Sequence, residues 1–413
     1  MRISTSSIFE AGTRQINTLQ SQLARTQQQL GSNKRMLSAA DDPIASARAL
    51  EVTQSQSINT QFATNRQNAR SSLSQLDVTL SSAQSLIQDV QTIVVAAGNG
   101  AYSPSDRETY ATELEGKLDD LLAVANTADG AGGYVFSGFK SSLAPYTKST
   151  TGAVYNGDQG QVMLQVGSSR KVQINATGPS VFDDIATGNG TFVTGTGNTN
   201  TGTGVVSPGV VSDASKITGH NYALQFAVTG TPAVTTYTVQ DLTTGLAVPP
   251  PVPPALSTPI VFQSGAPITF DGITFDVKGV PANGDTFSVA PSTKQSLFTT
   301  VTNLITALRS TTANTPAGKA AYTSALADAS NNLGASLDKV LGVRSSVGSN
   351  LKELDYLDTT GSDADIQYSD TLSQLQDLDM VKAISQFSQQ QSALEAAQKS
   401  FKSVSSLSLF NFI

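Results

Sequence analysis

The distribution of proline is the feature of this 413-residue chain that most constrains its fold. Twelve of the 16 prolines lie between Pro179 and Pro291, and the other four are Pro43, Pro104, Pro145 and Pro316. Because proline lacks a backbone donor and clashes with the preceding helical turn, it is confined to helix starts, turns and edge strands. The middle of the chain is therefore predicted to be non-helical, whereas both flanks can form long helices.

The N-terminal flank carries two apolar seams with alternating steps of three and four residues, the pattern of helices that pair in coiled coils. The first seam consists of Ile16, Leu19, Leu23, Thr26 and Leu30. The second consists of Ile58, Phe62, Asn65, Ala69, Leu73, Leu76, Leu80, Ala83, Ile87, Val90 and Val94. A third helix is predicted over residues 104–126, with an apolar face of Leu114, Leu118, Leu121 and Leu122.

Two of these helices are predicted to begin at a proline that follows a capping side chain. The Asp42 carboxylate can accept from the free N–H groups of a first turn, and Pro43 fits the first helical position, which needs no donor. Ser103, Pro104 and Asp106 repeat this arrangement as a capping box. An alternative reading makes Asp41 and Asp42 a catalytic or metal-binding pair, but Pro43 favours helix capping.

The C-terminal flank mirrors the N-terminal one. Its seam consists of Leu333, Leu337, Val340, Arg344, Val347, Leu351 and Leu354. Residues 359–363 (TTGSD) are predicted to break this helix. The last helix is predicted to pack through Met380, Ile384, Phe387, Gln391, Leu394, Gln398 and Phe401, with the two glutamines fixing the register. The chain ends on the apolar residues 407–413 (LSLFNFI).

The middle of the chain is predicted to form short antiparallel strands. Residues 161–166 and 171–174 flank a turn at Gly167 and indicate a hairpin. Residues 268–277 indicate a second hairpin with Asp271 and Gly272 in its turn. Residues 188–209, rich in Gly, Thr and Asn, are expected to form a loop, and residues 249–254 a polyproline II linker.

These patterns predict a mainly α fold with a β-rich insert. The N- and C-terminal helices pair in a long coiled-coil bundle, and a small antiparallel β domain is inserted between them. We expect a terminal coiled-coil domain of residues 1–41 plus 364–413, disordered in the monomer because a polar helix gains little stability without packing. A helical bundle with a β-hairpin would contain residues 42–177 plus 292–363. The β-rich outer insert would contain residues 178–291.

Composition argues against several classes of function. The chain has one histidine (His220), no cysteine, 14% charged residues and a net charge of −7. No catalytic, metal-binding or cofactor-binding set is therefore predicted, and a basic face for nucleic acid is missing. No apolar run is long enough to span a membrane. His220 is expected to lie in a turn or at the surface rather than to act as a general base.

Several segments resemble the flagellin-like axial proteins of the bacterial flagellum. Residues 30–43 (LGSNKRMLSAADDP) resemble the N-terminal signature of flagellins, and residues 343–351 resemble the start of their C-terminal part. Residues 134–138, 155–158, 377–381 and 408–413 are more similar to the junction proteins that join hook and filament. The resemblance covers residues 1–179 and 292–413.

This resemblance implies a structural, secreted protein of the extracellular flagellum, exported without cleavage by the flagellar type III apparatus and placed at the hook–filament junction. The implied partners are other copies in the same layer, the first hook-associated junction protein, flagellin, the filament cap protein and an export chaperone. No cofactor is implied.

The terminal helices have few partners within the chain, so we expect their apolar residues to make assembly contacts. These residues are Ile16, Leu19, Leu23, Leu30, Ile384, Phe387, Leu394, Phe401, Leu407, Phe410 and Phe412.

Two other functions stay open at this point. The chain could be a minor flagellin that polymerises into filament. It could also be a secreted adhesin whose insert binds glycans by stacking Tyr222, Tyr237, Phe262 and Phe270 on sugars, although alternating aromatic residues usually form a β core.

Overall fold

The computed structural model describes residues 5–99, 103–130, 132–248 and 259–406. The described residues form two compact units, one drawn from Met1–Arg66 and Asp355–Ile413 and the other from Gln67–Leu354. The linker predicted at residues 249–254 lies outside the described residues, as do Leu407, Phe410 and Phe412.

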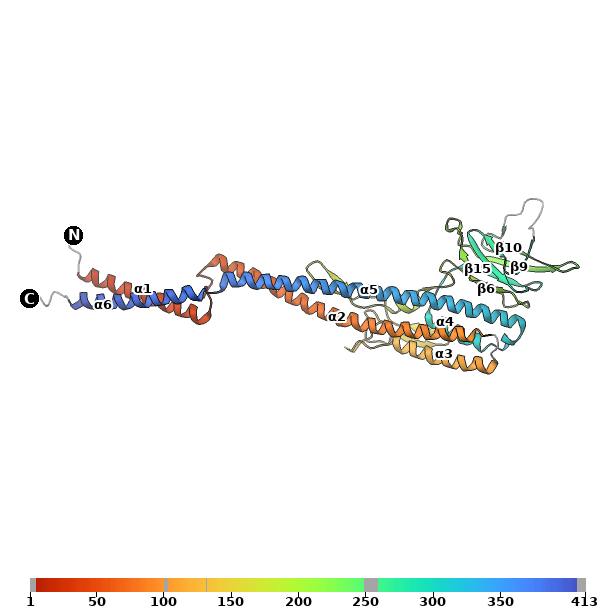
Figure 1. Cartoon of the computed structure of the whole chain (residues 1–413), viewed down its shortest axis with the longest axis horizontal. Helices are drawn as coiled ribbons and strands as arrows, with labels where there is room; N and C mark the ends of the chain where they lie inside the picture. Colours follow the sequence, from red (N-terminus) through yellow and green to blue (C-terminus); the bar gives the residue numbers. More distant parts are fainter. Residues whose placement is uncertain (1–4, 100–102, 131, 249–258, 407–413) are drawn as a thin grey trace, which may run out of the picture. The chain divides into compact units, whose positions relative to one another are not determined.

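Among the described residues, six α-helices occupy the two flanks of the chain (Figure 1). They are α1 (Thr5–Ser32), α2 (Pro43–Ala97), α3 (Pro104–Ala125), α4 (Leu297–Leu308), α5 (Pro316–Gln376) and α6 (Met380–Ser406). Two predicted starts are confirmed. The Ala45 N–H donates to Asp42 Oδ1 at 3.0 Å, and Ser103 forms a capping box with Asp106 before α3.

The helix break predicted at residues 359–363 is wrong, because α5 continues through this segment. Gly361 does not end the helix but allows the Arg66 side chain to approach the α5 backbone, because a Cβ atom there would lie 2.5 Å from Nη2 of Arg66. The Asn59 side chain donates to the Gly361 carbonyl at 2.8 Å, and the buried Arg66 pairs with Asp358. Helix α5 ends instead before the short segment 377–379, where a β-bridge joins Asp377 to Lys34.

Within the second unit, α2 and α5 pack antiparallel through the predicted seams. The side chains of the α2 seam from Ala69 to Val94 are buried, and Leu333, Val340 and Leu354 of α5 are each 0% exposed. Arg344, at a seam position, places Nε 3.0 Å from Asp77 Oδ1 and Nη1 2.5 Å from Gln84 Oε1. From Ala69 onward these inner seams therefore form core within the chain, whereas Ile58 in the first unit is 43% exposed.

Two short hairpins follow α3. Strands β1 (Tyr146–Ser149) and β2 (Gly152–Tyr155) form the first, and β3 (Met163–Gln165) and β4 (Lys171–Gln173) form the hairpin predicted around Gly167. A π-helical turn at Pro179–Asp183 then leads to the insert.

The insert consists of two antiparallel sheets. The larger has the order β11 (Ala247–Val248), β10 (Val234–Asp241), β9 (Tyr222–Thr229), β15 (Thr286–Pro291) and β6 (Phe192–Thr196), with β12 (Ile260–Val261) also paired to β10. The smaller has the order β13 (Pro267–Phe270), β14 (Ile273–Lys278) and β7 (Val205–Val206), with β8 (Val210–Val211) also paired to β14. The predicted hairpin turn is confirmed, since Asp271 and Gly272 both have positive φ, 43° and 76°.

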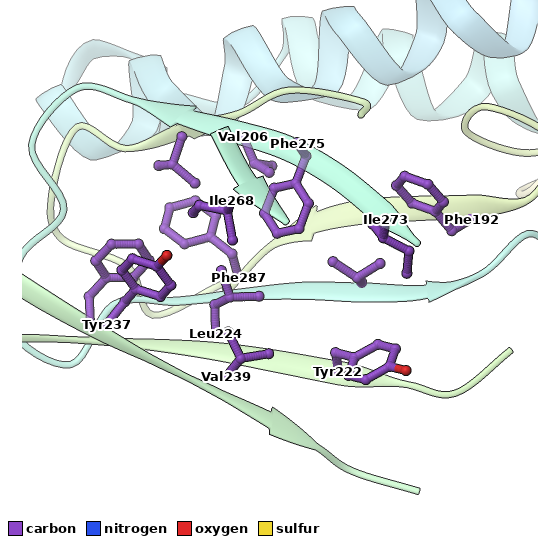
Figure 2. Packing of buried hydrophobic residues seen from close by; sticks show 13 residues of the cluster. Phe192, Val206, Tyr222, Leu224, Tyr237, Val239, Ile268, Ile273, Phe275 and Phe287 are labelled. Atoms are coloured by element: carbon purple, nitrogen blue, oxygen red, sulfur yellow. The ribbon is translucent and has the colours of Figure 1, made fainter. Parts of the chain in front are cut away.

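The loop predicted at residues 188–209 is also wrong in part, because it contains β6 and β7. Phe192 and Val206 are 3% and 4% exposed and anchor these strands in the core (Figure 2). The same core contains Tyr222 and Tyr237 and is packed by Phe262 and Phe270. These four aromatic side chains are therefore packing residues, which removes the structural basis of the glycan-binding alternative.

The chain enters and leaves the insert through one narrow neck. Strand β5 (Ile185–Ala186) pairs antiparallel with β16 (Lys294–Gln295), directly before and after the insert. The Thr187 N–H donates to the Thr293 carbonyl at 2.9 Å, and the Ser292 hydroxyl donates to the Thr187 carbonyl at 2.8 Å. The two connections to the insert are thus hydrogen-bonded to each other.

Candidate assembly interface

Helices α1 and α6 of the first unit lie side by side (Figure 1). They run antiparallel, since Phe9 contacts Phe401 near one end of the pair and Thr26 contacts Gln390 near the other. The predicted residues Ile16, Leu19, Leu23, Leu30, Phe387, Leu394 and Phe401 are half-buried along this contact, whereas Ile384 is 56% exposed. The pair therefore brings seven of the predicted residues into one seam.

The register predicted for α6 is wrong at several positions. The seam alternates Phe387, Leu394 and Phe401 with Ala383, Gln390 and Ala397, whereas Gln391 and Gln398 are exposed. Met380 and Ile384, which were also assigned to the seam, are 42% and 56% exposed. The seam positions were predicted wrongly because alanine and glutamine are weakly apolar or polar, whereas Met380 and Ile384 are strongly apolar.

Two contacts that the sequence did not reveal fix the distance between α1 and α6. The rings of Phe9 and Phe401 are 4.9 Å apart between centroids and inclined by 47°. Gly12 permits this approach, because a Cβ atom there would lie 2.7 Å from Cδ2 of Phe401. Thr26 is 6% exposed, and its hydroxyl donates to Oε1 of Gln390 at 2.9 Å.

The loop of residues 33–42 is tied to the segment between α5 and α6. Arg35 donates its backbone N–H to the Gln376 carbonyl at 2.8 Å and its Nη2 to the Leu375 carbonyl at 2.9 Å. The Leu378 N–H donates to the Asn33 carbonyl at 3.2 Å. Asp379 then caps α6 by accepting from the Lys382 N–H at 3.1 Å. The two helix breaks of the first unit thus support each other.

The Asp41 and Asp42 carboxylates are both occupied in this loop. Asp41 accepts from the backbone N–H groups of Leu37 and Ser38, which lower its pKa, and pairs with Arg25 at 2.7 Å. Asp42 accepts from the Ala45 N–H, which lowers its pKa, and lies 3.3 Å from Arg35. These contacts account for both acids as structural groups and favour helix capping over a catalytic pair.

The first unit exposes many large apolar side chains. They are Phe9, Leu37, Ile44, Leu50, Ile58, Tyr356, Ile366, Met380, Val381 and Ile384, of which Ile44 and Val381 are 83% and 82% exposed. Beside the 33–42 loop lies a shallow hollow of about 310 Å³, lined in part by Met36, Leu37 and Leu50. The unit therefore presents both projecting and recessed apolar surface.

The described residues offer little for catalysis. They contain no cluster of three His, Asp or Glu side chains that could hold a metal ion. His220 Nδ1 lies 2.7 Å from Asp241 Oδ2 at the start of β9. Burial would raise the pKa of Asp241, but this hydrogen bond and the Thr244 and Thr243 N–H groups lower it to about 2. Among the helices described, none has the length and apolar character of a membrane span.

Comparison with known proteins identifies the same helical flanks. Residues 3–141 match the bacterial flagellin N-terminal helical region. The whole chain is similar to flagellar hook-associated protein 3 of Escherichia coli (strain K12), with 28% identity over 410 residues and 99% coverage of both chains. The name of that relative makes it a hook-associated protein of the flagellum.

Two solved structures from Legionella pneumophila have the same fold. Flagellar hook-associated protein-3 is 32% identical, with a TM-score of 0.74 over 78% of this chain and 98% of that one. The flagellar junction protein FlgL is also 32% identical, with a TM-score of 0.72 over 80% of this chain and 100% of that one. The helical flanks, the β-rich insert and the sequence identity together place this chain in the family of flagellar hook-associated protein 3 (FlgL), structural proteins of the bacterial flagellum that assemble with other flagellar components.

Proposed function

We propose that this protein forms the junction between hook and filament by packing its paired terminal helices against those of neighbouring copies. The proposal rests on a contrast between two seams of similar sequence pattern. In the second unit, Leu73, Leu76 and Leu80 of α2 are at most 1% exposed. In the α1–α6 pair, the corresponding leucines at 19, 23 and 30 are only half-buried.

Two helices alone cannot enclose a seam, because each covers one side of the other and leaves the flanking positions to water. Further helices around the pair would bury these flanks, together with Val381 and Ile384. Other copies of the same chain supply such helices in a layer. Seam residues Ile16, Leu19, Leu23, Leu30, Phe387, Leu394 and Phe401 would then act within each copy, and Ile384 between copies.

The hollow beside the 33–42 loop supports a contact in which two different surfaces of neighbouring copies meet. A projecting apolar side chain such as Val381 and a recessed surface at Leu37 and Leu50 are different parts of one unit. When a patch on one copy fits a different patch on the next, the contact repeats head to tail and builds a ring or a helical layer. This is the geometry that a layer within a tubular filament requires.

The remaining parts of the proposal follow from the family. The layer would contact the first hook-associated junction protein on one side and flagellin and the filament cap protein on the other. The chain would leave the cell uncleaved through the type III export apparatus, with a chaperone on its C-terminal helix, and act outside the cell. Helices α1 and α6 would become ordered only on assembly.

The test is a strain that lacks this protein, studied by electron microscopy of whole cells and by an assay for flagellin in the medium. Intact hooks without filaments, with monomeric flagellin in the medium, are expected. Normal filaments on such cells would reject the junction role. Complementation with the wild-type gene provides the control.

A minor flagellin would behave differently in a purified system. Seeded with filament fragments, a flagellin extends them into long filaments, whereas a junction protein stops after a short layer. Electron microscopy of seeded reactions measures this difference directly. Long filaments made of this protein alone would favour the flagellin alternative.

A further inference from the structure

A cavity of about 290 Å³ lies in the second unit where the neck of the insert meets α4 and α5. Its wall includes Thr187 and Gln295 at the neck, Thr300 and Asn303 on α4, and Asp328 and Asn332 on α5. This volume is near the lower end of the range of about 300–1,000 Å³ for ligand sites. The cavity can therefore hold a small molecule but not a folded segment of protein.

Most polar groups of this wall already have partners within the chain. Asn332 Oδ1 accepts from the Gly188 N–H at 3.1 Å. The Thr300 hydroxyl accepts from Gln295 Nε2 at 2.9 Å and donates to the Ser296 carbonyl at 3.2 Å. These hydrogen bonds fix the positions of Asn332, Thr300 and Gln295 in the cavity wall.

The Asp328 carboxylate differs from these groups, and it is the charged group of the cavity wall. No hydrogen bond or ion pair joins it to any residue that the structure describes, and burial raises its pKa to about 6. The basic residues on the neighbouring elements do not neutralise the negative charge of Asp328. Lys339 on α5 donates to the Asp184 carbonyl at 2.7 Å, and Lys294 on β16 forms no ion pair with Asp328.

Asp328 is half-buried, and its carboxylate destabilises the folded chain at neutral pH, because partial burial without a partner disfavours the charged form. An amide of the same shape would avoid this cost. Charged groups that are costly in a cavity are more often found where a ligand uses the charge. Gln295 and Asn303 line the same cavity as Asp328, and their side chains carry amide oxygens that can accept hydrogen bonds.

We propose that this cavity binds a small organic cation that carries a primary ammonium or guanidinium group, with Asp328 as its counter-ion. The N–H donors of such a group would be shared between the carboxylate and the neighbouring side-chain oxygens, as in other charge-assisted hydrogen bonds. The site lies within the second unit and does not depend on the assembly contacts of α1 and α6.

The experiment is a calorimetric titration of the purified full-length protein at pH 7.5 with n-propylammonium and methylguanidinium chloride. Saturable binding with a Kd on the order of 1 mM is expected. n-Propanol and tetramethylammonium, which lack the charge or the N–H donors, are expected not to bind. At pH 5 about a tenth of Asp328 is ionised, so binding should weaken roughly tenfold. Absence of saturable binding by both cations would overturn the proposal.

Three variants distinguish binding in this cavity from a general effect of the protein's charge on cation binding. Asp328→Asn removes the counter-ion, and Ala325→Leu fills the cavity from its wall without changing a charge. Both should weaken binding at least tenfold. Asp338→Asn removes an exposed carboxylate from the same helix and should bind as the wild type does. Equal binding by the wild type and Asp328→Asn would overturn the proposal, with circular dichroism as the check that each variant is folded.

The same ammonium group can belong to a free amine or to a lysine side chain of another protein. Nα-acetyl-lysine N-methylamide distinguishes these sources. If it binds at least as tightly as n-propylammonium, the cavity accepts a lysine side chain with its backbone outside. If only the smaller cations bind, the ligand is a free amine.

Discussion

The aromatic ring of Phe401, on α6, packs against the ring of Phe9, on α1, with 4.9 Å between the two centroids. This contact joins residues that are almost the full length of the chain apart. It depends on Gly12, because any side chain there would occupy the space of the Phe401 ring. The two terminal helices are thus matched to each other before any neighbouring copy is considered.

The substitution Gly12→Ala is expected to displace Phe401 and weaken the α1–α6 pair, although alanine favours helix by about 1 kcal/mol. Overpacking of this kind costs about 1–3 kcal/mol, so layer formation should need severalfold more protein. Gly31→Ala, with no atom within 4 Å of the added Cβ, is the control and should assemble at least as well as the wild type. Light scattering of the assembly reaction measures both. Equal assembly by the two variants would show that the Phe401 contact is unimportant.

The substitution Val381→Ser tests the exposed surface of α6. Because Val381 is 82% exposed, serine should leave the free energy of unfolding within about 0.5 kcal/mol of the wild type. Assembly should nevertheless weaken, since apolar area is lost from the proposed contact. Val280→Ser, at a valine that is 69% exposed in the insert, is the matched control. An unchanged assembly curve for Val381→Ser would remove this surface from the interface.

The substitution Gly361→Ala tests why α5 contains a glycine at this position. The new Cβ would collide with the buried guanidinium of Arg66, so a loss of about 1–3 kcal/mol in unfolding free energy is expected. Gly342→Ala, in open space on the same helix, should instead stabilise by up to about 1 kcal/mol. Chemical denaturation followed by circular dichroism measures both changes. Stabilisation by both substitutions would mean that Arg66 moves aside freely.

The substitution Asp328→Asn should change how stability depends on pH. The pKa of Asp328 is higher in the folded chain, about 6 against 3.8, so the folded state binds the proton more tightly. Stability is therefore lost as pH rises from about 4 to above 6. Each pKa unit corresponds to about 1.4 kcal/mol, and water in the cavity reduces the total, so the variant should be about 1–2 kcal/mol more stable at pH 7.5 and equal at pH 4.

Thermal unfolding across this pH range measures the effect, and Asp338→Asn is the control for the loss of one negative charge. The control should show no such pH-dependent gain, because Asp338 is exposed. A wild type and an Asp328→Asn variant with parallel pH profiles would contradict the raised pKa.

The sequence was sufficient where short-range chemistry decides the structure. Helix starts at Pro43 and Pro104 depend on the adjacent capping residues, and the turn at Asp271 depends on two residues that accept positive φ. The seam of α2 could be predicted because leucine, isoleucine or valine occupies almost every seam position between residues 73 and 94. In each case the signal and its structural effect lie within a few residues.

The errors occurred where a distant residue decides. Gly361 resembles a helix breaker, but its role is set by Arg66 on another helix. The seam of α6 includes Gln390 because Thr26 supplies a hydrogen-bonding partner, which no pattern within α6 reveals. Strand β6 forms in a glycine-rich segment because β15, almost a hundred residues later, offers it a pairing edge. Asp328 gave no sequence signal, since its burial depends on α4 and the neck.

The neck of the insert has a consequence for how these proteins can diversify and be engineered. Residues 187 and 293 are hydrogen-bonded to each other, so the two ends of the chain segment between them lie close together. A different module with closely spaced termini can be grafted there without lengthening or shortening the helices that carry it. The insert can thus be exchanged as a cassette, for instance for an epitope or an enzyme, while the helical scaffold is kept.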